Sequence, residues 1–269
     1  PCTAQHNPQD TSCIHLSALV VQEKLGSGAS GDVHRALWRR DGYDPGTPVA
    51  LKLFAADSGS DGLADDEIAV TGAVGYHPNI LQTIARVQGD NGEKGLAMEL
   101  LDRGWRALGK PPSFDSVTRD VYDEGAVFTA SQTVKLLRGI ASALAFIHSK
   151  GIVHGDVYAH NILVTDTCSR PLLSDWGAAF FYERNSEQGK EFEAIEVRAF
   201  GCLMEEVLDR VHDMTHAPYL QLRQLQRDCL SIYPSSRPPF KTIASRLAKL
   251  SEGTLSCNVY DTQEWLRIA

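Results

Sequence analysis

The sequence lacks several features that would assign it to a broad class of protein. No apolar run reaches the roughly 18–20 residues of a membrane-spanning helix. The first residues carry neither the charged nor the apolar segment of a secretory signal peptide. The six cysteines form no C-x-x-C pair, which argues against the usual zinc and dithiol motifs. We therefore expect an intracellular, cytoplasmic protein with reduced thiols. Because the chain also lacks an initiating Met, we expect it to be part of a longer chain with flanking modules.

Positive charge is also scarce. The 269 residues include 26 Lys and Arg against 34 Asp and Glu, a formal net charge of −8. A nucleic-acid-binding face needs clustered basic residues to neutralise phosphates, so we expect no nucleic-acid partner. Hydrophobic residues make up 43% of the chain and charged residues 22%, as in soluble globular proteins. The length allows one large domain or two lobes.

The hydrophobic pattern changes along the chain. The first hundred residues read as strands around 19–25, 33–38, 49–54, 80–87 and 95–101, with one helix at 64–75. Helical spacing dominates afterwards: about 19 residues capped by Thr129 or Ser131, then roughly 193–210, 218–231 and 239–250. We expect an α+β protein of two lobes. The predicted boundaries are a loose leader at 1–16, a strand-rich lobe at 17–101, a loop region at 102–128, a helical lobe at 129–252 and a C-terminal extension at 253–269.

A glycine cluster lies between the first two predicted strands. It reads G-x-G-x-x-G-x-V, as Gly26-Ser27-Gly28-Ala29-Ser30-Gly31-Asp32-Val33. Glycines let the backbone N–H groups come close to phosphates. A dinucleotide site would need a helix after the motif, whereas a strand follows here. Taken alone, the motif is equally compatible with a plain glycine hairpin.

Lys52 lies within the apolar strand sequence Val49-Ala50-Leu51-Lys52. A buried charge is costly unless it is paired. Glu67 on the following helix is the expected partner, with Asp66 as the alternative. A Lys52 that faced the sheet edge would need neither carboxylate as a partner, and this alternative stays open.

Two carboxylates follow short strands in the second half of the chain. One belongs to the pattern H-x-D-x-x-x-x-N, written here as His154-Gly155-Asp156-Val157-Tyr158-Ala159-His160-Asn161. The other belongs to Ser174-Asp175-Trp176-Gly177. A carboxylate can accept a hydroxyl proton, and carboxylate and amide oxygens bind hard cations such as Mg²⁺.

In this order, the motifs resemble those of a protein kinase domain, from about residue 19 to residue 250. The turn His77-Pro78-Asn79 and the late segment 234–240 resemble the family as well. The resemblance implies a bilobal α+β fold. Its N-lobe would be a five-stranded antiparallel sheet with the αC helix, and its C-lobe would be mainly helical. Residues 102–128 would form the hinge and αD region, with an insertion-like loop.

The resemblance also implies roles for individual residues. ATP would be bound by Leu25, Gly26, Ser27, Gly28, Ala29, Ser30, Gly31, Val33, Ala50, Lys52, Glu67, Met98, Glu99, Leu101 and Leu163. Mg²⁺ would be bound by Asn161 and Asp175. Asp156 would orient the acceptor hydroxyl, and Lys52 and Asn161 would complete the catalytic set.

Several positions depart from the family pattern. Gly155 replaces the Arg that reads a phosphate on the activation segment, and Tyr158 replaces the Lys that contacts the γ-phosphate. The segment after Gly177 is short and has no Ala-Pro-Glu. We hypothesise that Glu183 pairs with Arg237 instead, with Glu187, Glu191 and Glu193 as the next candidates. Glu196 replaces an Asp and keeps the charge that could cap the catalytic loop.

We therefore predict a kinase, atypical and weak if the departures impair it, that transfers the γ-phosphate of ATP to a protein hydroxyl in the presence of Mg²⁺. Ser or Thr is favoured over Tyr as the acceptor. The alternatives are an ATP-binding regulatory module without activity, and a small-molecule kinase of the aminoglycoside or choline type, which the Gly155 form resembles. The spaced histidines of His212-Asp213-Met214-Thr215-His216 are interpreted as a solvated helix end rather than a zinc site. His77 and His160 are interpreted as loop packing.

Overall fold

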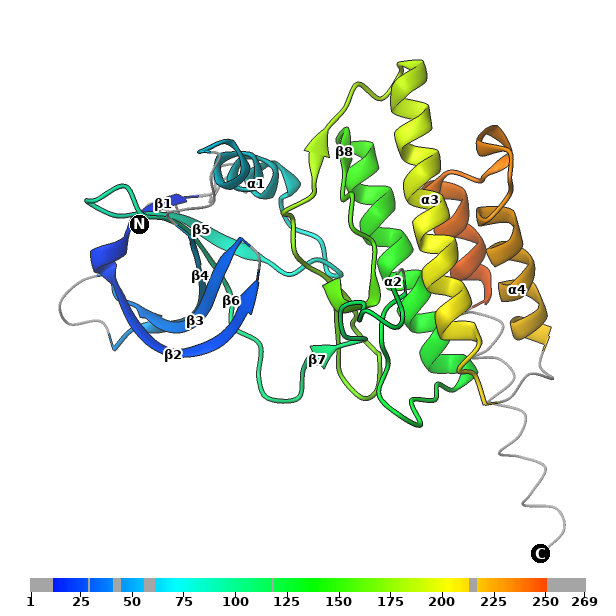
Figure 1. Ribbon diagram of the computed structural model, residues 1–269, viewed down its shortest axis with the longest axis horizontal. Coiled ribbons are helices and arrows are strands. Elements are labelled where there is room, and N and C mark those ends of the chain that lie inside the picture. Colours follow the sequence, from blue (N-terminus) through cyan, green and yellow to red (C-terminus); the bar gives the residue numbers. More distant parts are fainter. Residues whose placement is uncertain are drawn as a thin grey trace, which may run out of the picture.

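The computed structural model describes residues 12–28, 30–40, 45–55, 61–117, 119–212 and 217–250. A curved sheet with one helix forms the N-terminal lobe, and a group of long helices forms the C-terminal lobe (Figure 1). The α+β bilobal fold expected from the sequence is confirmed. Residues 213–216 of the histidine-spaced segment, the C-terminal extension and most of the predicted leader lie outside the described residues.

The N-terminal sheet has six strands in the order β1-β5-β6-β4-β3-β2. Their bounds are Ser12–His15 (β1), Leu19–Gly28 (β2), Gly31–Trp38 (β3), Thr47–Phe54 (β4), Thr83–Gln88 (β5) and Lys94–Glu99 (β6). Strands β2 to β6 pair antiparallel, as expected, whereas β1 pairs parallel to β5. The sheet is therefore mixed.

The prediction of five strands was wrong by one, because residues 12–15 were assigned to a loose leader. Strand β1 covers the edge of β5, which would otherwise present unpaired backbone groups. A 3₁₀ turn, η1 (Leu16–Ala18), then leads into β2. Four residues with a single strongly apolar member, Ile14, carry too little alternation to signal a strand.

Helix α1 (Asp61–Val74) packs on the sheet against β5 and β6. It starts a few residues before the predicted helix at 64–75. One buried cluster lies on the sheet and contains Leu19, Ala36, Val49, Leu51, Ala85, Val87 and Ala97. Val70 and Val74 of α1 belong instead to the larger core that the helical lobe forms.

The C-terminal lobe contains helices α2 (Ala130–Ser149), α3 (Glu187–Leu208) and α4 (Ala217–Cys229), and residues 240–250 are also helical. Thr129 caps α2 in a capping box with Gln132. Helix α3 begins at Glu187 rather than near 193, because the Ser186 hydroxyl caps it by accepting from the Gly189 N–H. Its polar first turns gave no apolar periodicity. None of the described helices is long and apolar enough to cross a membrane.

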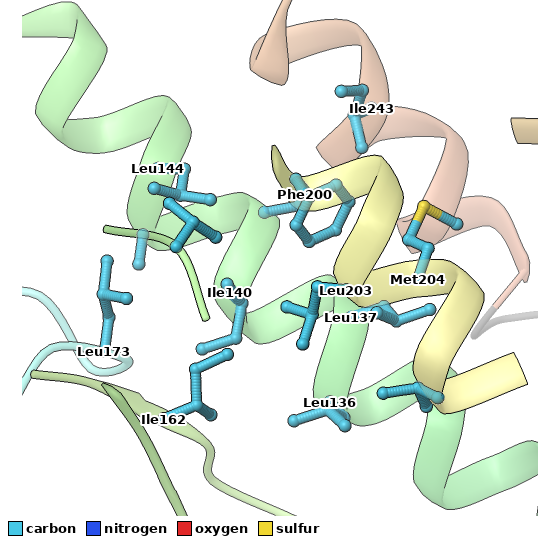
Figure 2. Close-up of a cluster of buried hydrophobic side chains, with 14 of the residues drawn as sticks. Leu136, Leu137, Ile140, Leu144, Ile162, Leu173, Phe200, Leu203, Met204 and Ile243 are labelled. Carbon is cyan, nitrogen blue, oxygen red and sulfur yellow. The ribbon is translucent and has the colours of Figure 1, made fainter. Parts of the chain in front are cut away.

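Buried side chains of α2 and α3 meet in the centre of this lobe (Figure 2). Leu137 and Ile140 of α2 lie near Leu203 of α3, and Ile243 adds to the cluster from the last helix. Each fully buried side chain of this size contributes about 1.5–3 kcal/mol. This large core supports the loops that the C-terminal lobe carries.

Short strands and turns hold those loops in place. Strands β7 (Arg106–Ala107), β9 (Ile162–Val164) and β10 (Leu172–Leu173) form one small sheet. Strands β8 (Ile152–Val153) and β11 (Phe180–Phe181) form another. Two 3₁₀ turns are η2 (Ala159–Asn161) and η3 (Pro234–Ser236).

Lys150, directly after α2, links the two lobes. Its Nζ donates to the backbone carbonyls of Val74 and Ala73, at 2.8 and 3.2 Å, at the C-terminal end of α1. That helix has no basic residue in its own last turn. A cation from the other lobe therefore satisfies the terminal carbonyls and complements the helix dipole.

Candidate active site

One face of the N-terminal sheet gathers four of the residues singled out in the sequence. Lys52 and Ala50 are two positions apart on β4 and so point to the same side. Val33 is the direct neighbour of Lys52 on β3, and Met98 is the direct neighbour of Ala50 on β6. Cross-strand neighbours share a face, so all four side chains lie on one side of the sheet.

Lys52 forms the main buried ion pair of this region. Its Nζ lies 2.6 Å from Oε1 of Glu67 on α1, and both side chains are buried. The pair confirms Glu67 as the partner, whereas Asp66 is exposed. Burial raises the pKa of Glu67, and the attraction of Lys52 only partly opposes that effect. The same Nζ lies 3.9 Å from Oδ1 of Asp175, so Lys52 connects α1 to the other lobe.

The glycine cluster forms the hairpin between β2 and β3. Gly26 pairs with Val33 and Gly28 with Gly31, while Ala29 lies outside the described residues. A Cβ on Gly31 would overlap the Leu53 carbonyl oxygen of β4, so only glycine fits there. A Cβ on Gly26 would meet nothing within 4 Å. The hairpin is therefore tight against β4 at its base and open along its β2 side.

The chain leaves the sheet after Glu99. The Glu99 N–H donates to the Gln82 carbonyl at 2.8 Å, and its carboxylate lies 3.4 Å from Nη2 of Arg170. Leu101 follows and is partly exposed, as is Leu163 on β9. Among the described residues, no backbone hydrogen bond engages Leu101, which leaves its N–H and carbonyl for other partners.

Asp156 and Asn161 are joined within the catalytic loop. The Asn161 Nδ2 donates to the Asp156 carbonyl at 3.0 Å and to its Oδ2 at 2.8 Å. The amide oxygen of Asn161 is then left to accept or to coordinate. The Ser174 N–H and hydroxyl both donate to the Asn161 carbonyl at 2.9 Å. These bonds fasten the strand end that carries Asp175 to the loop that carries Asp156.

Asp175 has a left-handed backbone conformation, with φ of 62°. A non-glycine residue in that region is uncommon and strained, and such residues gather at functional sites. The Gly177 N–H donates to its Oδ1 at 3.2 Å, and over half of the side chain is exposed. Trp176 beside it is buried, with its ring 5.0 Å from that of His154.

Gly155 occupies a position where a larger residue would be strained and would clash with its surroundings. Its φ is 79°, and a Cβ there would overlap the Ala178 carbonyl oxygen. The Gly155 N–H donates at 2.7 Å to Glu196, whose buried carboxylate also accepts from Nε2 of His148 at 2.6 Å. The expectation that Glu196 caps the catalytic-loop backbone is confirmed.

His160 and Asp120 adjoin this site, although the sequence did not connect them. The His160 Nδ1 lies 2.9 Å from Asp120 Oδ1, and its Nε2 lies 3.7 Å from Asp156 Oδ2. The two carboxylates raise the pKa of His160 to about 9, and His160 is the main cause of a lowered pKa at Asp156. Loop packing alone was thus an incomplete interpretation of His160. The available signal was its position four residues after Asp156.

The segment after Gly177 is held by β11, which pairs with β8, and by the Tyr182 hydroxyl, which donates to Glu193. The predicted Glu183–Arg237 pair was wrong. Arg237 donates to the carbonyls of Ala194 and Ser231, at 2.8 and 2.9 Å. Within the described part of the chain, Arg237 forms no ion pair with Glu183 or with the other candidate glutamates. Arg237 still lies beside α3, where it binds the Ala194 carbonyl, while the neighbouring Glu193 accepts from the Tyr182 hydroxyl.

A family model for protein tyrosine and serine/threonine kinases matches residues 19–214. The chain belongs to the protein kinase family. The matched part runs from the start of β2 past the end of α3, so it includes the glycine hairpin, the Lys52–Glu67 pair and the catalytic loop.

Relatives of this kinase domain include both serine/threonine and receptor kinases. A probable serine/threonine-protein kinase of Dictyostelium discoideum, gdt2, is 22% identical over 80% of this chain and 13% of its own length. The ephrin type-B receptor 4a of Danio rerio is 28% identical over 91% of this chain and 28% of its length. The calcium/calmodulin-dependent protein kinase type 1B of Rattus norvegicus is 31% identical over 60% of this chain and 43% of its length. The chain thus spans less than half the length of each of these proteins.

Proposed function

We propose that this domain is an ATP- and Mg²⁺-dependent protein kinase that phosphorylates a hydroxyl of a protein, with Ser or Thr favoured over Tyr. The single observation that carries the proposal is the position of Lys52, 2.6 Å from Glu67 and 3.9 Å from Asp175. A lysine held by one buried carboxylate and close to a second, exposed one would bind phosphate oxygens beside a cation.

Asp156 would act on the acceptor. The acceptor hydroxyl oxygen forms a bond to the γ-phosphorus, and the bond to the oxygen that bridges the β- and γ-phosphates breaks. That oxygen keeps the electron pair and leaves with ADP, while the hydroxyl proton passes to Asp156. Its lowered pKa keeps Asp156 ionised before transfer, so that it can accept a hydrogen bond from the hydroxyl. Positioning and charge neutralisation then supply most of the rate enhancement.

The residues present fit Mg²⁺. The described residues contain no group of three or more His, Cys, Asp or Glu side chains that could hold a metal by themselves. Mg²⁺ often binds through one or two protein oxygens together with substrate phosphates and water. Asn161 offers its amide oxygen and Asp175 an exposed carboxylate, on strand ends joined through Ser174. When bound, the cation would neutralise charge on the β- and γ-phosphates.

Adenine would lie against the sheet face that carries Ala50 and Val33, with Leu163 beneath it and Met98 behind it. The N–H and carbonyl of Leu101 have no backbone partner among the described residues, so they would bind the edge of the base. The glycine hairpin, from Leu25 to Gly31, would cover the phosphates, and the open β2 side at Gly26 leaves room for them.

The acceptor side supports a second candidate function, an ATP-binding regulatory module that transfers nothing. Tyr158 stands two residues after Asp156, where the family resemblance implies a phosphate-contacting lysine. In addition, the segment between Gly177 and α3 is too short to form the usual peptide platform. The small-molecule alternative rests on Gly155. The positive φ of Gly155 and the closeness of the Ala178 carbonyl already favour a glycine at this position, so Gly155 says nothing about the size of the acceptor.

The test is phosphate transfer from ATP with Mg²⁺, measured on the chain itself and on a generic protein substrate. The chain would be compared with Asp156→Ala and Asp175→Asn. Transfer that both changes reduce to a low residual rate would support the kinase proposal. No transfer, with a melting temperature that Mg·ATP still raises, would overturn it in favour of the regulatory module. ATP consumption only on addition of a small alcohol would favour a small-molecule kinase.

A further inference from the structure

Asp120 is a buried carboxylate on a loop. Its side chain has no exposed surface, and it lies between β7 and α2, far in sequence from the catalytic loop. A buried charge of this kind must be compensated by hydrogen bonds or an opposite charge. The compensation comes from His160, whose backbone N–H donates to Oδ2 at 2.7 Å and whose Nδ1 lies 2.9 Å from Oδ1.

The position of Asp120 is set independently of His160. Next to it, Arg119 forms ion pairs with Glu205 at 2.6 Å and with Glu206 at 3.2 Å, both on α3. On its other side, the backbone of Val121 exchanges two hydrogen bonds with Lys110. The carboxylate is therefore a fixed support, anchored to the large helical core, rather than a side chain that follows the catalytic loop.

His160 passes this support on to Asp156. With Nδ1 bound to Asp120, the ring turns Nε2 toward Asp156 Oδ2, 3.7 Å away. The ring of Tyr158 stacks on that of His160, with centroids 5.5 Å apart and planes 28° apart, and so restricts rotation of the imidazole. The contact falls on the same oxygen that accepts from Asn161 Nδ2 at 2.8 Å.

The two oxygens of Asp156 are thereby made unequal. Oδ2 has both side-chain partners, and Oδ1 has none among the described residues. We propose that Asp120 and His160 are positioning residues that hold Asp156 by Oδ2 and leave Oδ1 to receive the acceptor hydroxyl. The inference rests on the proposed kinase function, since it concerns the orientation of that function's central carboxylate.

The experiment measures kcat and KM for ATP in four variants of the full chain. Asp120→Asn removes the charge that holds the ring. His160→Asn keeps an amide donor near the position of Nδ1, but this donor cannot reach Asp156. His160→Gln keeps an amide donor near the position of Nε2, which faces Asp156. Asp123→Asn is the matched control, because Asp123 lies three residues further along the same loop in an exposed pair with Lys110.

We expect Asp120→Asn and His160→Asn each to lower kcat by about tenfold, with KM for ATP changed by less than about twofold, since orientation rather than binding is lost. His160→Gln should retain more kcat than His160→Asn, and Asp123→Asn should match the unmodified chain. In an Asp156→Ala background, Asp120→Asn should lower the residual rate no further, because residues that act as a unit are not additive.

The failures can be told apart. No transfer by the unmodified chain would overturn the proposed function, and this inference with it. Transfer by the unmodified chain with unchanged kcat in the His160→Asn variant would overturn the inference alone. An equal loss from Asp120→Asn in the presence and absence of Asp156 would also overturn it, because that result reveals a general structural role. Should Asp120→Asn not fold, the comparison of His160→Asn with His160→Gln still decides.

Discussion

The nucleotide side of this site follows the family pattern closely, whereas the acceptor side departs from it. On the nucleotide side, Lys52 pairs with Glu67 as the motifs predict, and its Nζ also lies 3.9 Å from Asp175. On the acceptor side, the segment after Gly177 enters α3 within ten residues, and Arg237 binds two carbonyls in place of a carboxylate. The residues that would face ATP and Mg²⁺ are constrained by a triphosphate that is the same for every kinase. The residues that would face the acceptor are constrained by a substrate that differs from one kinase to the next.

The largest expected effect lies on the nucleotide side. Replacing Lys52 with Met removes the cation that would hold the phosphates and leaves Glu67 buried without its partner. We expect phosphate transfer to fall by about 100-fold or more, as when a preorganised charged group is removed from an active site. The matched control is Lys94→Met, which breaks an exposed pair with Asp65 and should leave the rate unchanged. A Lys52→Met rate close to that of the control would place the phosphates elsewhere.

The next largest effect, on stability, concerns Gly155, which directly precedes Asp156. Substitution with Ala both strains a φ of 79° and forces a Cβ onto the Ala178 carbonyl. We expect a loss of about 2–4 kcal/mol in unfolding free energy, from backbone strain together with overpacking. Denaturant unfolding would measure it. Gly125→Ala separates the two causes, because Gly125 has a φ of 76° but open space around it, and should cost only about 1 kcal/mol.

A smaller effect should appear in the dependence of stability on pH. The pKa of His160 is raised to about 9 in the folded chain by Asp120 and Asp156, from an ordinary value near 6.5. Its contribution to stability is fully present below pH 6.5 and is lost as the pH rises to about 9. Melting temperatures of the metal-free chain should therefore exceed those of His160→Gln at pH 6 by more than at pH 9.5. A constant difference across that range would contradict the raised pKa.

The smallest effect tests the acceptor side. Because Arg237 donates to Ala194 and Ser231, Arg237→Ala should cost about 1–2 kcal/mol of stability through two lost hydrogen bonds. Glu183→Gln should lie within about 0.5 kcal/mol of the unmodified chain, because Glu183 is exposed and forms no ion pair with another described residue. Equal losses in the two variants would restore the Glu183–Arg237 pair that the sequence suggested.

Residues close together in sequence, or on neighbouring strands, were predictable. The Lys52–Glu67 pair followed from a lone charge in an apolar strand and a helix directly after it. The cap on Gly155 by Glu196 followed from the family pattern. The Asp120–His160 contact was not predictable, since it joins a loop without periodicity to a turn 40 residues later. Strand β1 was too short to show alternation, and the early start of α3 depended on a single cap, Ser186.

The lysine that spans the two lobes has a mechanical consequence. Because Lys150 holds the last carbonyls of α1, that end of the helix belongs to the helical lobe, while its side lies on the sheet. Any rotation of the sheet away from the helical lobe then pivots near Val74. Glu67 lies seven residues from that pivot, a lever arm of about 10 Å. Opening of the lobes would therefore strain the Lys52–Glu67 ion pair most and leave the helical core unchanged. The domain would lose this ion pair, and with it activity, before it lost stability.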